Sequence, residues 1–511
     1  MHPLAQLDQT YVWHPFTQMR DWLRREPIVI TRGQGAWLRD ARGRAYLDAN
    51  ASIWTNLHGH HHPKLNAAIQ RQLKKISHSS ALGLANEPAS LLAEQLVKAA
   101  NHCGPAAARH SRFKHQPRAR AALDPAPLSK VFFSDNGSTA LEVALKLAYQ
   151  FTLRNRGKMT QKNKRRRAEP KFLALDGAYH GDTIGAVSLG HIDLFHQAYR
   201  SLVFKTDQVM APYCYRCPFN QAKPDRLDAR KYRQCHWECV GRIEQKFSRQ
   251  KRLGNPYAGF VFEPLMQGAA GMIPQPGGWL GQATEIARSY GALLIADEVM
   301  TGFGRTGETC HVDARVIAEV MKHPIRGKLF ATTRAGVVPD FLCVAKGLTG
   351  GYLPMAATLT TQPVFDAFLG EYEEFKTFFH GHSFTGNQLG ASAALASLDL
   401  LQTQASVLQR LRLQKLLRTE LDSLWSLPQV GDIRQVGLVA GIELVKNWRT
   451  RAPFDLRERA GIRVCEGMAQ RGVLTRPVGN VIVLMPPYCT TPAQLQTMVG
   501  ALRESVRACQ W

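Results

Sequence analysis

Two short apolar runs in the middle of the chain each end in a charged side chain that could act in catalysis. Lys346 follows the run 341–345, and Asp297 follows the run 293–296. Burying a lysine at the end of an apolar strand is costly unless the amine is paired or functional, and desolvation there would lower its pKa and make it nucleophilic. The structural alternative is a lysine whose amine reaches solvent. Asp297 could hold a protonated ring nitrogen or could simply cap a loop.

Two further runs lead to small polar residues and to an aromatic ring. The run 131–134 continues into Gly137 and Ser138, directly before a helical pattern. Backbone N–H groups and a hydroxyl at a helix N-terminus suit a phosphate, although an ordinary helix cap has the same composition. Tyr179 follows the run 172–175 and is expected near the same edge of the sheet.

A phosphate cradle, an acid, an aromatic ring and a nucleophilic lysine together meet the needs of pyridoxal 5′-phosphate. This cofactor requires a lysine for covalent attachment, a carboxylate that keeps its pyridine nitrogen protonated, an aromatic face and a phosphate site. The sequence therefore predicts a pyridoxal 5′-phosphate site at one sheet edge.

The elements that would position these groups are buried strands separated by helical patterns. Runs that are apolar on both faces and alternate with helices predict an α/β fold with a mostly parallel sheet between helices. Ligands of such sheets bind at the carboxyl ends of the strands, where the groups above lie. The expected strands are 131–133, 172–175, 259–262, 293–296 and 341–345.

We expect a smaller α+β domain built from both ends of the chain. An amphipathic helical pattern begins near residue 395, and short strands follow around 437–444 and 481–485. The N-terminal part should join them, because 35–38 and 45–48 have the pattern of a hairpin. The expected division is residues 1–75 and 371–511 for the small domain and 76–370 for the large domain.

Composition excludes several other classes of protein. The 511 residues are 45% hydrophobic and 21% charged, which excludes wholesale disorder. Ten cysteines are too few for a disulfide scaffold, so a reducing cytoplasm is the expected location. No apolar run is long enough for a membrane span, and no secretory signal is readable at the start.

About half of the net charge of +25 comes from two stretches without apolar periodicity. Residues 104–127 carry a net +4 and residues 154–171 a net +8, which together give 12 of the 25. We expect exposed insertions into the large domain. The run 162–167 could bind nucleic acid by counterion release, but no nucleic-acid motif accompanies it, so nucleic acid is an unlikely partner.

The segments 297–307 and 345–351 strongly resemble the class III pyridoxal-phosphate aminotransferases. The resemblance implies a fold-type I transferase, with a large cofactor-binding domain and a smaller domain from both termini. Within that class, five segments resemble the branch that converts 8-amino-7-oxononanoate to 7,8-diaminononanoate in biotin biosynthesis. These segments are 13–19, 52–54, 179–183, 379–387 and 475–480.

The resemblance also implies a role for each matching residue. Lys346 would hold the cofactor covalently and move the proton during two-stage transamination. Asp297 would pair with the ring nitrogen of the cofactor. Tyr179 and Val299 would cover the two faces of the cofactor ring. The implied phosphate ligands are Gly137, Ser138 and Thr385 of the partner subunit, which makes the active site composite and the enzyme a homodimer.

Further positions are implied at the substrate. Arg476 would hold its carboxylate, which a guanidinium can do with two hydrogen bonds. An ion pair between Arg305 and Glu263 would complete the site. The residues expected around the substrate are Phe16, Trp54, Gly381, Arg476 and Arg305.

The amino donor and the exact reaction stay open. Phe16 and Ile53 depart from the commoner family pattern in a way that resembles lysine-dependent members, although S-adenosylmethionine is the usual donor. Another class III enzyme acting on ω-amino acids or diamines is one alternative. A basic nucleic-acid-binding protein on an inactive aminotransferase fold is the other, but the intact Lys346, Asp297 and Ser138 argue against it.

Two features have no place in this chemistry. The cysteines are paired as CxxC and CxxxC, a spacing that suits a structural zinc site but equally suits free thiols. They are Cys214, Cys217, Cys235 and Cys239. The insertion 311–336 is longer than the family pattern requires, and the sequence suggests no role for it.

Overall fold

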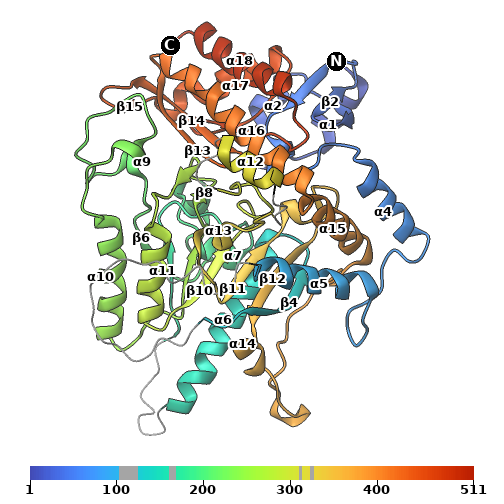
Figure 1. Ribbon diagram of the computed structural model, residues 1–511, viewed down its shortest axis with the longest axis vertical. Coiled ribbons are helices and arrows are strands. Elements are labelled where there is room, and N and C mark those ends of the chain that lie inside the picture. Colours follow the sequence, from blue (N-terminus) through green and yellow to red (C-terminus); the bar gives the residue numbers. More distant parts are fainter. Residues whose placement is uncertain (103–124, 160–168, 310–313, 323–326) are drawn as a thin grey trace.

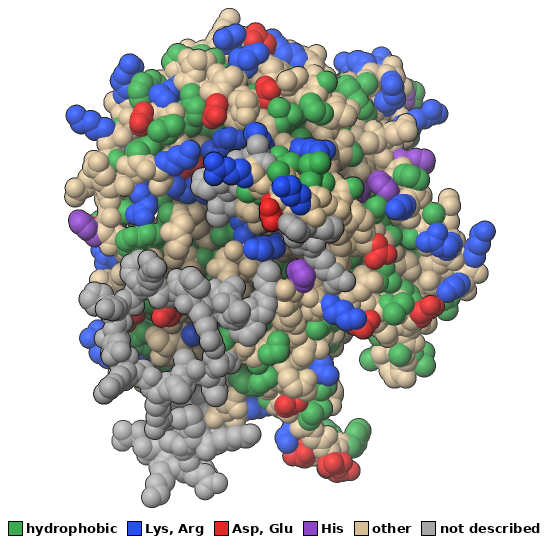
Figure 2. Space-filling model, in the orientation of Figure 1, with side chains coloured by type: hydrophobic (Ala, Val, Ile, Leu, Met, Phe, Trp, Pro, Cys, Tyr) green, Lys and Arg blue, Asp and Glu red, His purple; other side chains and the backbone are tan. Residues whose placement is uncertain are grey.

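The computed structural model describes residues 1–102, 125–159, 169–309, 314–322 and 327–511. Most of the two basic stretches lies outside these residues. The insertion 311–336 is described in part, as helices α12 (Ala314–Lys322) and α13 (Ala331–Ala335). Figure 2 shows Lys and Arg side chains at many separate places on one face of the molecule.

A seven-stranded sheet forms the centre of the molecule (Figure 1). Its order is β4 (Leu128–Ser134), β12 (Ala356–Thr361), β11 (Phe341–Val344), β10 (Leu293–Asp297), β7 (Gly259–Phe262), β5 (Phe172–Leu175) and β6 (Asp207–Val209). Strands β11, β10, β7, β5 and β6 are parallel, whereas β12 runs antiparallel to both β11 and β4. The predicted α/β fold with a mostly parallel sheet is confirmed.

Both faces of this sheet are covered, which explains why its strands are apolar throughout. Helix α6 (Gly137–Met159) packs on one face, against side chains such as Val261 and Ile295. Helices α5 (Glu87–Ala100), α10 (Glu238–Arg252) and α11 (Trp279–Ser289) share a core with the alternate side chains of the same strands, such as Phe262 and Leu294. Successive residues of a strand point to opposite faces, so both must be apolar.

Two smaller sheets lie beside the central one, and strands from both ends of the chain meet in the first of them. The first contains β1 (Ile30–Gln34), β2 (Trp37–Asp40), β3 (Ala45–Asp48) and β16 (Val473–Leu474), in which β3 and β16 are parallel. The second contains β13 (Val430–Val436), β14 (Val439–Asn447), β18 (Val481–Leu484) and β17 (Pro477–Val478), with β15 (Ala452–Pro453) on β14. The pairing of β3 with β16 supports a small domain drawn from both termini; its boundaries stay a prediction.

The remaining elements connect and cover these sheets. Among the described residues, no helix is long and apolar enough to cross a membrane. The other helices and short strands are α1 (Pro3–Tyr11), α2 (Met19–Leu23), α3 (Ala51–Trp54), α4 (Pro63–Leu73), α7 (Ile184–Leu189), α8 (Asp193–His196), α9 (Ala229–Tyr232), α14 (Gln362–Asp366), α15 (Gln388–Leu401), α16 (Gln404–Asp422), α17 (Ala460–Gln470), α18 (Pro492–Ala508), β8 (Met266–Gln267) and β9 (Ile273–Pro274).

Candidate active site

Lys346 lies just beyond the carboxyl end of β11, at the start of a short 3₁₀ turn, Lys346–Thr349. Its φ of 44° lies in the left-handed region, which is uncommon for a residue with a side chain. Its Nζ is 4.5 Å from the centre of the Trp54 ring. Burial lowers the pKa of this amine, and the nearby Asp297 and Glu263 only partly oppose that effect. The amine therefore loses its proton more easily than an ordinary lysine.

Asp297 is the last residue of β10 and is almost fully buried. Its Oδ2 is 2.7 Å from Nδ1 of His180, and its Oδ1 accepts a hydrogen bond of 3.0 Å from the backbone N–H of Val299. Burial disfavours a charged imidazole, but the bond to Asp297 outweighs it and raises the pKa of His180. These two hydrogen bonds thus fix the orientation of the Asp297 carboxylate.

Glu263 follows β7 at the same sheet edge and is buried beside this pair. Its two carboxylate oxygens accept hydrogen bonds from the backbone N–H groups of Tyr179 (3.4 Å) and Gly268 (2.8 Å). Burial raises the pKa of Glu263 to about 7, and the charge of Asp297 adds to the rise while His180 opposes it. Glu263 therefore fixes the backbone of the loop that carries Tyr179.

The loop that follows β5 is held against the N-terminus of α6. The hydroxyl oxygen of Ser138 accepts a hydrogen bond of 3.1 Å from the backbone N–H of Asp182. The hydroxyl of Tyr179 donates a hydrogen bond of 2.6 Å to Oδ2 of Asp182. Burial, together with this bond, raises the pKa of Tyr179, so the phenol stays protonated.

Two glycines make this close approach possible. A Cβ added at Gly181, whose φ is +119°, would lie 1.9 Å from the Ser138 hydroxyl oxygen. A Cβ at Gly137 would lie 2.8 Å from Cγ1 of Val299. The cradle at the α6 N-terminus is thus lined by backbone and a hydroxyl, which fits a phosphate group. Together with Lys346 and Asp297, these residues fit pyridoxal 5′-phosphate.

Trp54 lies on a strained segment. All four residues of α3 have positive φ, with values of 43° at Ala51, 42° at Ser52, 59° at Ile53 and 71° at Trp54. Consecutive left-handed residues with side chains are costly and persist where the surroundings enforce them. Asp48 provides that enforcement, because its Oδ2 accepts hydrogen bonds from the backbone N–H (2.8 Å) and the hydroxyl (2.9 Å) of Ser52.

Phe16 and Arg476, expected at the substrate, lie together although they are far apart in the sequence. Arg476 donates a hydrogen bond of 3.4 Å to the backbone carbonyl of Phe16, and its side chain is exposed. The Phe16 ring lies edge-on to Tyr179, with ring centres 6.5 Å apart. The exposed guanidinium of Arg476, beside Phe16, can receive a carboxylate from solvent.

The expected ion pair between Arg305 and Glu263 is wrong. Arg305 is buried, and its guanidinium donates to the backbone carbonyls of Pro486 (2.8 Å) and Asn56 (3.2 Å). Glu263 is satisfied by backbone N–H groups instead. Arg305 therefore ties the N-terminal segment to the C-terminal segment, and its role toward the substrate stays a prediction.

Thr385 and Gly381 lie on the loop that precedes α15. The Thr385 hydroxyl oxygen accepts a hydrogen bond of 3.0 Å from the backbone N–H of His382, and His382 Nδ1 is 2.8 Å from Asp135 Oδ2. Gly381 is exposed, and an added Cβ there would meet nothing within 4 Å. The predicted role of Thr385 requires a second subunit, and the role of Gly381 at the substrate stays a prediction.

His180 is the functional residue to which the sequence assigned no role. It lies in the quoted segment 179–183, but its partner Asp297 is 117 residues away. The signal available in the sequence was a histidine between an aromatic residue and a glycine, just after an apolar strand. The contact with Asp297 could not be predicted, because it depends on the parallel order of β5, β7 and β10.

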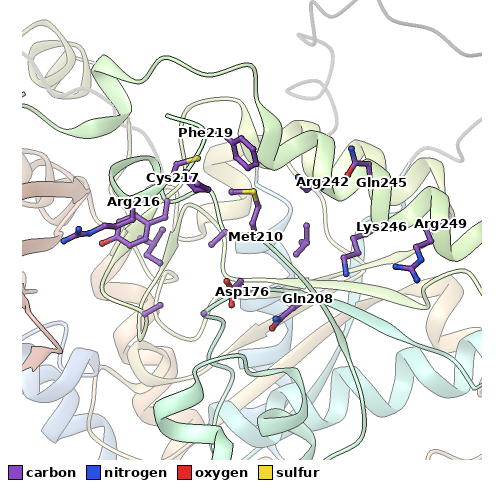
Figure 3. A pocket seen from close by; sticks show the side chains of 17 residues that line it. Asp176, Gln208, Met210, Arg216, Cys217, Phe219, Arg242, Gln245, Lys246 and Arg249 are labelled. Carbon is purple, nitrogen blue, oxygen red and sulfur yellow. Dashed lines mark hydrogen bonds between the residues drawn. The ribbon is translucent and has the colours of Figure 1, made fainter. Parts of the chain in front are cut away.

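A separate cavity of about 730 Å³ lies between β6 and α10 (Figure 3). Lys246 and Arg249 of α10 border it on one side, and Cys217 and Phe219 border it on another. None of the residues predicted for the cofactor or the substrate lines this cavity, so the residues around Lys346 remain the candidate active site.

The family model for class III aminotransferases matches residues 19–322 and 325–506. The chain belongs to this family, as the sequence motifs predicted, and it is an aminotransferase with the fold of the class.

Curated relatives extend the match over the whole chain. The chain is 43% identical over 503 residues to the adenosylmethionine-8-amino-7-oxononanoate aminotransferase of Geobacter sulfurreducens, covering 98% of this chain and 97% of that one. Identity to the protein of the same name from Methanocaldococcus jannaschii is 37%, covering 99% and 98%.

Solved structures give the same picture. The crystal structure of the Methanocaldococcus jannaschii enzyme of that name superposes with a TM-score of 0.81 and 34% identity over 99% of each chain. An amine transaminase from an uncultivated Pseudomonas species, in its PLP-bound form, superposes with a TM-score of 0.80 and 29% identity over 98% of this chain and 99% of that one.

Proposed function

We propose that this protein is the transaminase that converts 8-amino-7-oxononanoate to 7,8-diaminononanoate in biotin biosynthesis. The observation that carries the chemistry is the partly buried Lys346, whose amine is desolvated and lies at the same sheet edge as Asp297 and the α6 N-terminus. The full-length similarity to enzymes named for this substrate supports the specificity.

Pyridoxal 5′-phosphate is the cofactor, as the sequence predicted. When bound, the cofactor would supply an electron sink for the negative charge that develops on the substrate carbon bearing the amino group. Asp297 holds the proton on the ring nitrogen, and its own orientation is fixed by His180. Tyr179 and Val299 cover the ring. Gly137, Ser138 and the N-terminal N–H groups of α6 hold the phosphate.

Lys346 then acts as the general acid and base. Its amine is desolvated, so its pKa lies below the ordinary lysine value and closer to the operating pH, where proton transfer is most effective. The Trp54 ring, 4.5 Å from Nζ, excludes water from one side of the amine. Lys346 Nζ carries the proton between substrate and cofactor in both half-reactions.

The substrate is positioned by its carboxylate and its aliphatic chain. Arg476 receives the carboxylate as a charge-assisted pair, and Phe16 and Trp54 contact the aliphatic chain. S-adenosylmethionine is the amino donor, which agrees with the names of the relatives. Lysine remains the alternative donor suggested by Phe16 and Ile53.

The working enzyme is a homodimer in the cytoplasm. Apolar side chains exposed near the predicted shared site support a partner subunit, namely Leu82 (89% exposed), Phe379 (70%) and Phe384 (60%). Thr385 of the partner subunit completes the phosphate site. The described cysteines are free thiols, which fits a reducing compartment.

Borohydride reduction of the holoenzyme, followed by peptide mass spectrometry, tests the assignment of the cofactor lysine. We expect the phosphopyridoxyl group on Lys346, and Lys346→Ala should lose both this adduct and the visible absorbance of the cofactor. An adduct on another lysine would contradict the assignment.

Activity assays then decide between the related reactions. We expect 7,8-diaminononanoate to form from 8-amino-7-oxononanoate with S-adenosylmethionine, in preference to lysine. Activity with a simple amine and pyruvate, and none with 8-amino-7-oxononanoate, would instead favour the amine transaminase function of the Pseudomonas neighbour.

A further inference from the structure

Four cysteines from two separate segments line one small enclosed cavity beside the N-terminus of α10. Cys214 and Cys217 lie on the segment after β6, and Cys235 and Cys239 lie at the start of α10. The cavity holds about 10 Å³, which is the size of a single water molecule or ion. The CxxC and CxxxC pairs singled out in the sequence therefore converge on one point of the fold.

Hydrogen bonds hold the two segments in register around this cavity. The Asn220 side chain donates to the backbone carbonyl of Cys214 at 3.0 Å and accepts from the backbone N–H of Gln234 at 3.0 Å. The backbone N–H of Gln221 donates to the carbonyl of Gln234, also at 3.0 Å. These contacts tie the CxxC segment to the residue that precedes Cys235.

Two N–H donors point at the sulfurs. Arg233 donates a hydrogen bond of 3.0 Å to Cys235 Sγ, while its guanidinium stacks on the Trp237 ring at 4.0 Å. Trp279 is fully buried, and its Nε1–H has no acceptor at full hydrogen-bond geometry. Trp279 and Cys239 belong to the same buried core. Such donors around sulfur are typical of the surroundings of metal-bound thiolates.

We propose that Cys214, Cys217, Cys235 and Cys239 bind one Zn²⁺ as a tetrahedral structural ion. Each thiol releases its proton to solvent as its S–Zn bond forms, and the resulting double negative charge is partly balanced by Arg233. Four sulfur ligands without an open position are characteristic of structural rather than catalytic zinc.

The site closes when the ion binds. Among the described residues, no group of three or more His, Cys, Asp or Glu side chains is already arranged as a metal site. The two partly exposed cysteines, Cys217 and Cys235, lie outside regular helices and strands and can turn their sulfurs inward. Cys217 also borders the open cavity of about 730 Å³, which gives the ion a path from solvent (Figure 3).

The ion would brace the segment 210–239 against the C-terminal sheets. Arg216, between the two cysteines of the CxxC pair, forms a salt bridge of 2.6 Å with Glu443 of β14. Arg226 of the same segment donates to the backbone carbonyl of Val430 at 2.6 Å. Fixing Cys214 and Cys217 therefore fixes Arg216 and its contact with β14.

Metal analysis of the full-length holoenzyme, purified under reducing conditions without chelator, tests the proposal. We expect one zinc per chain in the wild type and in the control variant Cys509→Ser, whose cysteine lies outside the cluster. Cys217→Ser should weaken zinc binding by at least about tenfold, and Arg233→Ala should weaken it less.

Cobalt substitution in the wild-type protein identifies sulfur ligands without any variant, so it still applies if a cysteine variant fails to fold. Wild-type protein stripped of metal and titrated with Co²⁺ should show sulfur-to-cobalt charge-transfer bands that saturate at one ion per chain. The absence of these bands, or mass spectrometry that finds the four cysteines joined as disulfides after reducing purification, would overturn the proposal. Neither readout depends on transaminase activity, so the proposed reaction is tested separately.

Discussion

The two carboxylates at the edge of the central sheet, Asp297 and Glu263, have different hydrogen-bond partners. Asp297 faces a histidine whose pKa is raised, whereas Glu263 faces two backbone N–H groups and is buried. The sequence identified Asp297, because it ends an apolar strand, but it paired Glu263 with Arg305. Two backbone carbonyls hold Arg305 instead, and nothing in the residue types reveals which backbone atoms will lie near a side chain.

The raised pKa of Glu263 makes the stability of the apoenzyme depend on pH. The folded state binds the proton more tightly than the unfolded state, so stability falls as pH rises from 4.5, the ordinary value, to about 7. This loss amounts to roughly 3 kcal/mol. Denaturant unfolding across this range should show that Glu263→Gln lacks this part of the decline. An identical slope in the variant would show that Glu263 keeps an ordinary pKa.

Arg476 should affect substrate binding without affecting the cofactor. We expect Arg476→Ala to raise KM for 8-amino-7-oxononanoate about 10- to 100-fold, because a charge-assisted pair with the carboxylate is lost. The absorbance of the bound cofactor should not change. Arg471→Ala, an exposed arginine at the end of α17, is the matched control. Unchanged kinetics for Arg476→Ala would remove this residue from the site.

At the scale of elements, the strands were the most predictable part. The expected runs 172–175 and 259–262 coincide with β5 and β7, because burial on both faces makes such strands apolar throughout. The antiparallel strand β12 and the left-handed segment α3 were not predicted. Strand direction depends on the connection between elements, and the conformation of α3 depends on hydrogen bonds from Ser52 to the buried carboxylate of Asp48 at the end of β3.

The junction between α6 and the loop after β5 requires glycine at position 181. We expect Gly181→Ala to displace Ser138, to destabilise the protein by about 1–3 kcal/mol and to weaken cofactor binding. Thermal unfolding and titration with pyridoxal 5′-phosphate measure the two effects. Gly281→Ala in α11, where an added Cβ meets nothing within 4 Å, is the control and should be neutral or stabilising by about 0.5–1 kcal/mol. Equal behaviour of the two variants would contradict the steric argument.

At the scale of the whole molecule, one chain leaves the predicted site incomplete. Thr385 lies on a loop whose neighbours Phe379 and Phe384 are largely exposed, and within the chain its hydroxyl oxygen accepts from His382. The family motif predicted its role in a shared site, but composition and periodicity of a single sequence carry no information about which surfaces meet a second copy.

Hybrid dimers test whether Thr385 acts across subunits. A dimer of one Lys346→Ala chain and one Thr385→Ala chain has one site that combines an intact Lys346 with an intact Thr385 only if Thr385 comes from the partner. We expect differently tagged, co-purified hybrids to recover about half of the wild-type activity per dimer, the share of one intact site of two. Hybrids no more active than the Thr385→Ala homodimer would show that Thr385 serves its own chain.

The parallel pairing of β3 with β16 joins Leu47 to Val473 and Asp48 to Leu474. During synthesis on the ribosome, this edge of β3 stays unpaired until β16, near the end of the chain, has emerged. Asp48 also fixes the segment that carries Trp54. The segment that carries Trp54, a residue predicted at the substrate, should therefore become fully packed only late in translation, and a chain truncated before β16 should lack this packing.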